Sequence, residues 1–139
     1  MIDRILVAVD GSSQAQKAFD FAISLAKKYN SILTIISVIN LPDYLERTRK
    51  IKALEQDLMK QFTRIQEELM EIGRTNGVEV KSVIEFGHPA DKIVEFASKG
   101  NFDLVVVGSK GRSKVERFHL GATSDKISHH STVPVLIVK

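Results

Sequence analysis

The sequence of 139 residues contains no cysteine and no tryptophan, and only 3 of its residues are proline. The lack of cysteine excludes disulfides, thiol nucleophiles and zinc–thiolate centres. No apolar run approaches the roughly 18 residues that a membrane-spanning helix needs. Asp3 and Arg4 interrupt the apolar residues at the N-terminus. We therefore expect neither a membrane span nor a secretory signal, and a cytoplasmic protein.

A large excess of one charge is also missing. The chain has 20 Lys and Arg residues against 17 Asp and Glu residues, a net charge of +3. This excess is small and no dense basic tract accompanies it, so we expect no nucleic-acid partner. Hydrophobic residues make up 43% of the chain and charged residues 27%, which is typical of a folded globular protein. The length predicts a single domain over residues 1–139.

Five short apolar runs predict β-strands at residues 2–9, 32–39, 78–86, 102–107 and 133–138. All but the third are nearly continuous Val, Ile and Leu, as expected for parallel strands that are covered on both faces. Apolar residues at helical spacing predict helices between them, at about residues 12–29, 44–74, 89–99 and 121–130. This alternation predicts an α/β fold with a mostly parallel sheet and right-handed crossovers.

Two helices carry a clear inner face. In the first helix the predicted buried residues are Ala15, Ala18, Phe19, Ala22, Ile23 and Ala26. In the second they are Ile51, Leu54, Leu58, Phe62, Ile65, Leu69 and Ile72.

The stretch after the fourth predicted strand carries the strongest functional signal. Gly108, Gly111 and Gly121 form a Gly-x2-Gly-x9-Gly pattern, and a helix opens directly after the third glycine. Glycines let backbone N–H groups approach an anion closely, and a helix N-terminus offers unpaired N–H donors and a partial positive charge. The pattern predicts a phosphate cradle and therefore a protein that holds a nucleotide. Because ligands of such sheets bind beyond the carboxyl ends of the strands, Asp10 should lie on the same rim.

At this point the chain resembles the universal stress protein family over its whole length. The resemblance rests on the opening run that ends in Asp10-Gly11-Ser12, on the glycine pattern preceded by Asp103, and on the closing apolar strand after Pro134. It implies a Rossmann-like, open five-stranded parallel sheet of order 3-2-1-4-5 with helices on both faces. It also implies two classes of member, one that binds ATP and one that does not.

One position departs from the pattern of the ATP-binding class, which has Ser or Thr after the third glycine. Here that residue is Ala122, and hydroxyls follow only at Thr123 and Ser124. A hydroxyl that donates to a charged phosphate oxygen contributes roughly 1.5–3 kcal/mol. The backbone N–H groups remain, so we expect a weakened or altered hold on phosphate.

The resemblance implies ATP or AMP as the ligand, with Mg²⁺ bound alongside the triphosphate. Asp10 would lie near the ribose and serve as a ligand of the Mg²⁺, the backbone of Val38 would read the adenine edge, and Arg112 would meet phosphate. The residues expected at the nucleotide are Ala8, Asp10, Val38, Val107, Gly108, Gly111, Arg112, Gly121, Ala122, Thr123 and Ser124.

Several functions stay open. The first is a nucleotide-binding regulatory protein of the stress response, a homodimeric switch or scaffold with at most slow ATP hydrolysis. The second is a dimeric protein-interaction module that binds no nucleotide. An adenylating enzyme is a third, but its glycine-rich and histidine motifs are missing from the chain. A homodimer is expected in either of the first two cases, through the last strand from Val133 to Val138, because nothing later in the chain covers its edge.

Overall fold

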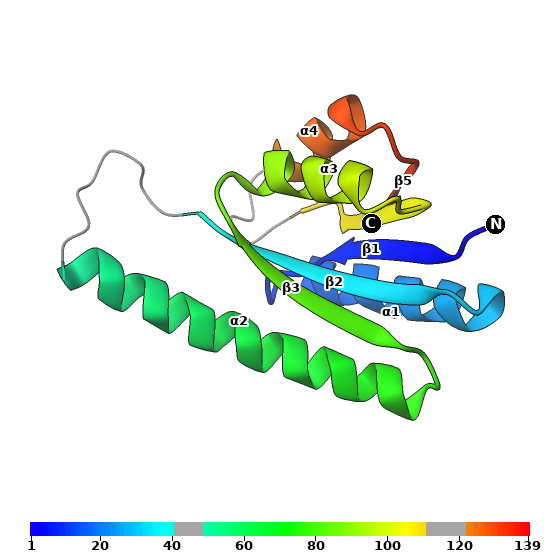
Figure 1. The fold of residues 1–139 in the computed structure, drawn as a ribbon, viewed down its shortest axis with the longest axis horizontal. Coiled ribbons are helices and arrows are strands. Elements are labelled where there is room, and N and C mark those ends of the chain that lie inside the picture. The colour runs from blue at the N-terminus through cyan, green and yellow to red at the C-terminus, as the bar shows by residue number, and fades with distance from the viewer. Residues whose placement is uncertain (41–48, 111–121) are drawn as a thin grey trace.

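The computed structural model of the protein describes residues 1–40, 49–110 and 122–139. Strands and helices alternate along the chain (Figure 1). Their bounds are β1 (Arg4–Ala8), α1 (Ser13–Tyr29), β2 (Ile32–Ile39), α2 (Arg49–Thr75), β3 (Val80–Phe86), α3 (Pro89–Lys99), β4 (Leu104–Gly108), α4 (Ala122–His130) and β5 (Val135–Val138). The strands form one sheet in the order β3-β2-β1-β4-β5, and all neighbours are parallel. The predicted fold class and strand order are confirmed.

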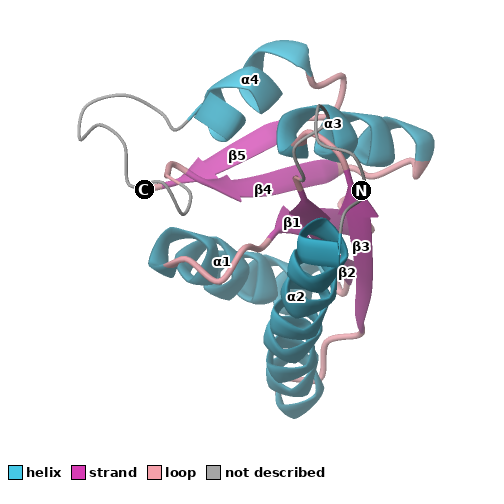
Figure 2. Cartoon of the chain, turned by 90° about the vertical axis from the view of Figure 1, so that its left-hand side faces the viewer, coloured by secondary structure: helices cyan, strands magenta, loops and turns pink. Residues whose placement is uncertain are grey.

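The sheet is the middle layer of three. Helices α1 and α2 lie against one face, and α3 and α4 lie against the other (Figure 2). Because side chains of a strand alternate between faces, β1 supplies both cores. Ile5 and Val7 pack with Phe19 of α1, whereas Leu6 packs with Ile127 of α4. This two-sided burial explains why the central strands read as continuous apolar runs.

Helix α1 follows its predicted pattern. The buried residues of the helix are the six that the spacing predicts, Ala15, Ala18, Phe19, Ala22, Ile23 and Ala26. Ser12 caps the helix, since its Oγ accepts a hydrogen bond of 3.1 Å from the Ala15 N–H. The helix ends at Asn30, whose φ of 56° turns the chain toward β2.

Helix α2 departs from its predicted face at both ends. Leu54 is 44% exposed and Ile72 is 36% exposed, although both were expected to be buried. The helix has 27 residues and is therefore about 40 Å long. The neighbouring β2 has 8 residues and spans only about 26 Å, so the first turns of α2, with Leu54, extend past the sheet (Figure 1). At the other end Leu69 and Gly73 are buried, and Ile72 lies beside that inner face. The predicted start of this helix, residues 44–48, lies outside the described residues.

Four strands begin two residues later than predicted, at Arg4, Val80, Leu104 and Val135. The residues before them are apolar for a different reason. Val78 and Phe102 are buried in the core but precede the paired part of their strands. The apolar residues before these strands therefore indicate burial of their side chains. Hydrogen-bonded pairing with the neighbouring strand begins only where the two backbones run side by side.

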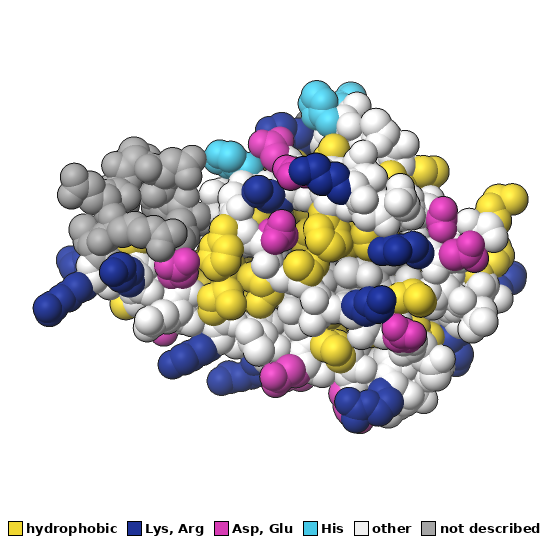
Figure 3. All heavy atoms as spheres, viewed as in Figure 1, with side chains coloured by type: hydrophobic (Ala, Val, Ile, Leu, Met, Phe, Trp, Pro, Cys, Tyr) yellow, Lys and Arg dark blue, Asp and Glu magenta, His cyan; other side chains and the backbone are white. Residues whose placement is uncertain are grey.

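The outer surface mixes charges of both signs. Figure 3 shows hydrophobic side chains in the middle of one face, with Lys, Arg, Asp and Glu interspersed around them. Phe86, at the end of the edge strand β3, is 43% exposed. Among the described residues, no helix combines the length and the apolar character that crossing a bilayer requires.

Asp103 ties the beginnings of two central strands together. Its Oδ2 accepts hydrogen bonds from the backbone N–H of Asp3 at 2.8 Å and of Arg4 at 3.0 Å, across the start of β1. These two backbone donors, that of Asp3 first, hold the pKa of the Asp103 carboxyl below its usual range. The carboxylate is the form that the folded state prefers.

Replacing Asp103 should change how stability depends on pH. The folded-state pKa is lowered, so the stabilisation is present above the unfolded pKa of about 3.9. It is lost as the pH falls through the folded-state pKa. We expect Asp103→Asn to lower the Tm at pH 7 and to flatten the acid limb of a plot of Tm against pH between pH 5 and pH 2, as measured by circular dichroism. An acid limb with the wild-type slope would contradict this role.

Candidate functional site

A cavity of about 500 Å³ opens at the carboxyl ends of the central strands. Its wall combines residues that are far apart in the sequence. The ends of β1, β2 and β4, the first turns of α1, α3 and α4, and two turns of α2 all contribute side chains or backbone. This is the place where the strand order reverses, since the chain leaves β1 toward β2 but leaves β4 toward β5.

Eight of the predicted site residues line this cavity: Ala8, Asp10, Val38, Val107, Gly108, Ala122, Thr123 and Ser124. They come from four separate elements and the residues next to them, so the fold brings together what the sequence only suggested. The other three, Gly111, Arg112 and Gly121, lie outside the described residues.

Other lining residues were not predicted from the sequence. They include Ile36, Ile39 and Asn40 on and after β2, Leu58 and Phe62 on α2, and Ile93 on α3. The apolar spacing of the helix predicts Leu58 and Phe62 only as core residues. A signal for them does exist, because a crossover helix that follows β2 must begin at the carboxyl edge of the sheet. The sequence does not show how far along α2 the cavity reaches.

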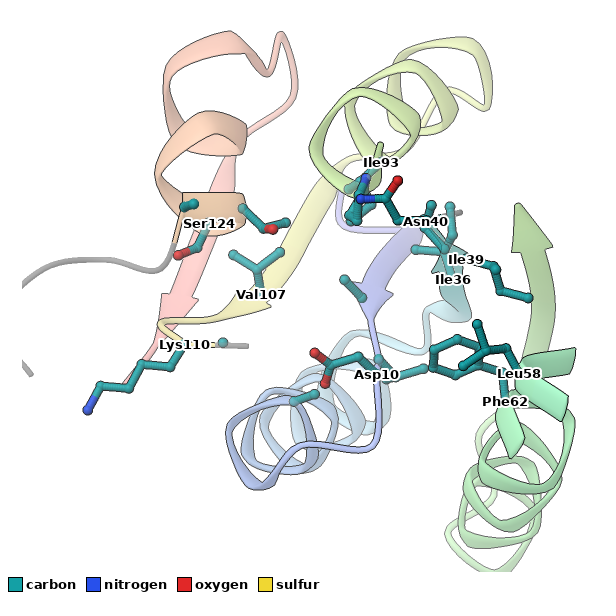
Figure 4. A pocket seen from close by; sticks show the side chains of 18 residues that line it. Asp10, Ile36, Ile39, Asn40, Leu58, Phe62, Ile93, Val107, Lys110 and Ser124 are labelled. Atoms are coloured by element: carbon teal, nitrogen blue, oxygen red, sulfur yellow. The ribbon is translucent and has the colours of Figure 1, made fainter. Parts of the chain in front are cut away.

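The two ends of the cavity differ in chemistry (Figure 4). Lys110 and Ser124 lie at one end, near the start of α4, and the Lys110 side chain extends away from the centre. Leu58 and Phe62 lie at the other end, which is largely apolar. The Asp10 carboxylate lies between them. Among the described lining residues, the charged side chains are Asp10 and Lys110.

Asp10 shapes the turn from β1 into α1. Its Oδ1 accepts a hydrogen bond of 2.9 Å from the Ser12 N–H, which is an Asx turn. The helix cap itself is Ser12. Gly11 between them has a φ of +84°, a conformation that other residues rarely adopt. One carboxylate oxygen is thus held by the turn, and this fixes the direction of the second oxygen.

Gly108 has a packing reason to be glycine. A Cβ built at this position would lie 2.9 Å from the backbone carbon and oxygen of Gln14, in the first turn of α1. Backbone atoms cannot move aside as a flexible side chain can. The close approach of α1 to the end of β4 therefore requires glycine here, independently of any ligand.

Ser124 joins the end of β4 to the start of α4. Its hydroxyl donates to the Ser109 carbonyl at 3.3 Å, and the residue is only 3% exposed. Thr123 and Ala122, which precede it in the first turn, are exposed. Of the two hydroxyls predicted near phosphate, that of Ser124 is engaged with the protein, and that of Thr123 belongs to an exposed side chain.

The backbone of Val38 faces the space beyond β1. The Val9 N–H donates to the Ile36 carbonyl at 3.0 Å on the β1 side, and the Gly87 N–H donates to the Ile39 carbonyl at 3.0 Å on the β3 side. Because backbone groups alternate between the two edges of a strand, Val38 points its N–H and C=O toward the β1 side. There β1 has already ended at Ala8, and the cavity begins.

A buried hydrogen-bond chain links α2 to this rim. Gln66 Nε2 donates to Ser37 Oγ at 3.1 Å and to the Val83 carbonyl at 2.9 Å. Ser37 Oγ in turn donates to the Val9 carbonyl at 2.8 Å. Gln66 is 4% exposed and Ser37 is 1% exposed. These hydrogen bonds therefore fix α2, with its cavity residues, relative to the middle of β3, the carboxyl-terminal part of β2 and Val9, which follows β1.

The donor set limits the kind of metal that the site suits. Among the described residues, no group of three or more His, Asp or Glu side chains is placed to hold a metal ion. A single carboxylate such as Asp10 suits Mg²⁺ that is held mainly by phosphate oxygens and water.

Removing the Gln66 amide should destabilise the protein. Gln66→Met keeps the length of the side chain but leaves two acceptors, the buried Ser37 Oγ and the partly buried Val83 carbonyl, without their donor. We expect the free energy of unfolding to fall by about 1–3 kcal/mol, measured by urea denaturation. Gln61→Met on the exposed side of the same helix is the matched control, and its stability should stay within about 0.5 kcal/mol of the wild type. Equal stability of the two variants would contradict the role of Gln66.

Comparisons with known proteins agree with the fold. Universal stress protein YxiE of Bacillus subtilis (strain 168) is 32% identical over 153 residues, which cover 100% of both chains. The structure of UspA from Lactobacillus plantarum superposes with a TM-score of 0.83 at 24% identity, covering 99% of this chain and 98% of that chain. A universal stress protein solved in complex with cAMP has a TM-score of 0.77 at 26% identity, covering 99% and 97%.

The sequence model of the universal stress protein family matches the chain over residues 1–139. Because this match covers the whole chain, the chain belongs to the universal stress protein family.

Proposed function

We propose that the cavity binds an adenine nucleotide, AMP or ATP, and that the protein acts as a homodimeric regulatory switch or scaffold built on a single domain of residues 1–139. The observation that carries the proposal is the division of one cavity of about 500 Å³ into an apolar end and a polar end. Its volume falls within the range of small-molecule sites. A nucleotide is divided in the same way, into a flat base and a charged tail.

The base would lie at the apolar end. Val38, Leu58 and Phe62 supply apolar walls there, and burying the faces of a base against such walls is favourable. The outward-facing N–H and C=O of Val38 match the neighbouring acceptor and donor on the adenine edge. The small side chain of Ala8 leaves room for the nucleoside.

The phosphates would lie at the polar end. The first turn of α4, with Ala122 and Thr123, offers backbone N–H donors and the positive end of the helix dipole. Lys110 would add a positive charge with its side chain turned inward, and Gly111, Arg112 and Gly121 are the residues proposed to complete the cradle. Asp10 would contact the ribose and bind the Mg²⁺ of a triphosphate.

The solved relative in complex with cAMP supports this assignment, because it shares the fold and 26% of its residues with this chain.

A regulatory role fits better than a metabolic one, since the proposed contacts hold a nucleotide without supplying a nucleophile and a base. Hydrolysis of bound ATP would then be slow at most. A dimeric interaction module without nucleotide is the alternative, and direct titration separates the two.

Calorimetric titration with AMP and with Mg²⁺–ATP tests the nucleotide proposal. We expect both to bind, and we expect Ala122→Thr to bind Mg²⁺–ATP about 10- to 100-fold more tightly than Ala122→Val. Threonine and valine have the same shape and differ by the hydroxyl, so the comparison isolates its hydrogen bond to phosphate. Absence of binding by the wild-type protein would overturn the proposed function. Equal affinities of the two variants would show that the phosphates do not contact the side chain at the start of α4.

The exposed edge of β5 favours the homodimer. On its β4 side, the Val105 N–H donates to the Pro134 carbonyl and the Ser109 N–H to the Val138 carbonyl, both at 2.9 Å. By alternation, Val135 and Ile137 direct their backbone groups to the other edge. All four residues of β5 are half-buried. An apolar edge that no strand of the described residues pairs with is suited to pairing with a second copy of the chain.

Ile137→Pro should weaken such a dimer. Proline removes the N–H at the open edge and leaves the bonds to β4 in place, because those use Pro134, Leu136 and Val138. The loss occurs in both copies, so we expect the dimer dissociation constant to rise about tenfold or more, as measured by sedimentation equilibrium. Ile137→Val retains the N–H and is the control. Ile137→Pro that stays folded and dimerises like the control would exclude this edge as the interface.

A further inference from the structure

Asn40 is a polar side chain at the apolar end of the cavity. It follows β2 directly and lies two residues after Val38, so the two side chains share one face of the extended chain. Figure 4 shows it beside Ile93 and near Ile36, far from Lys110 and Ser124. Across residues 1–40, 49–110 and 122–139, no hydrogen bond engages its carboxamide. The side chain is exposed at the rim and lines the cavity.

The chemistry of a carboxamide suits one class of base. Its NH₂ group donates and its oxygen accepts in the same plane. Adenine presents an amino group beside a ring nitrogen, a donor next to an acceptor, and Asn forms two hydrogen bonds with this edge. Hypoxanthine and guanine carry a carbonyl oxygen at the same carbon, so the edge that it forms with N7 has two acceptors and offers the carboxamide oxygen no donor in either orientation of the amide.

We propose that the Asn40 carboxamide selects adenine over 6-oxopurines. This inference rests on the proposed function and extends it from binding to choice of base. The backbone of Val38 has one N–H and one C=O, which can form hydrogen bonds with only one edge of the adenine ring. Asn40 stands two residues further along the same strand face and meets the adjacent edge. The apolar walls at Leu58 and Phe62 accept any purine, so discrimination between adenine and 6-oxopurines depends on the polar groups of Val38 and Asn40.

Titration of the full chain with AMP and with IMP tests this assignment. The two nucleotides have the same sugar and phosphate and differ in the six-membered ring, chiefly at the 6-position. We expect the wild-type protein to prefer AMP by about ten- to hundredfold, the discrimination that one good bidentate pair provides. In Asn40→Ala the preference should fall by about threefold or more, mainly through weaker AMP binding, and the Val38 backbone accounts for the preference that remains. Because Asn40 is exposed, this variant should keep the wild-type Tm.

Thr123→Val is the matched control at the opposite end of the cavity. Any change there affects AMP and IMP alike, so the ratio of their affinities should stay at the wild-type value. An Asn40→Ala protein that keeps the wild-type ratio, or a wild-type protein with no preference, would overturn the role of Asn40 while nucleotide binding stands. A wild-type protein that binds neither AMP nor IMP would overturn the proposed function and this inference with it.

Discussion

The position of β1 in the middle of the sheet is the constraint on which the rest of the structure depends. Its neighbours β2 and β4 carry the chain away in opposite directions, and right-handed crossovers then place α1 and α2 on one face and α3 and α4 on the other. The turns after β1 and β4 must therefore diverge. Divergence leaves a hollow at the carboxyl edge, and all of the described cavity residues surround it.

The groups that shape this hollow also hold the fold together. Gly108 lets α1 approach β4, Ser124 ties β4 to α4, and Gln66 ties α2 to β2 and β3. The described part of the cavity is thus preformed, which would lower the entropic cost of binding a ligand there. It also means that substitutions at Gly108 or Gln66 act on stability first. Exposed positions such as Ala122 and Asn40 are therefore better probes of binding.

Much of the fold was predictable because its residues report burial directly. The six inward residues of α1 follow helical spacing without exception, and the apolar strands follow from a sheet covered on both faces. The predictions were wrong where burial depends on length. Leu54 and Ile72 continue the apolar spacing of α2, but the sheet does not reach Leu54, and the inner face at the other end passes through Leu69 and Gly73, beside Ile72. The starts of four strands were placed early for a related reason, because apolar residues are buried before pairing begins.

The sequence by itself determined the order of strands and helices, the membership of the family, and the glycine and aspartate positions of the proposed rim, because these depend on local spacing and on residue type. Only the tertiary structure decided which side chains from distant segments share the cavity. Phe62 and Asn40 reach it because α2 starts at the carboxyl edge and β2 runs past the end of β1. Whether a side chain reaches the cavity depends on the relative lengths of neighbouring strands and helices, and no single segment of the sequence encodes these.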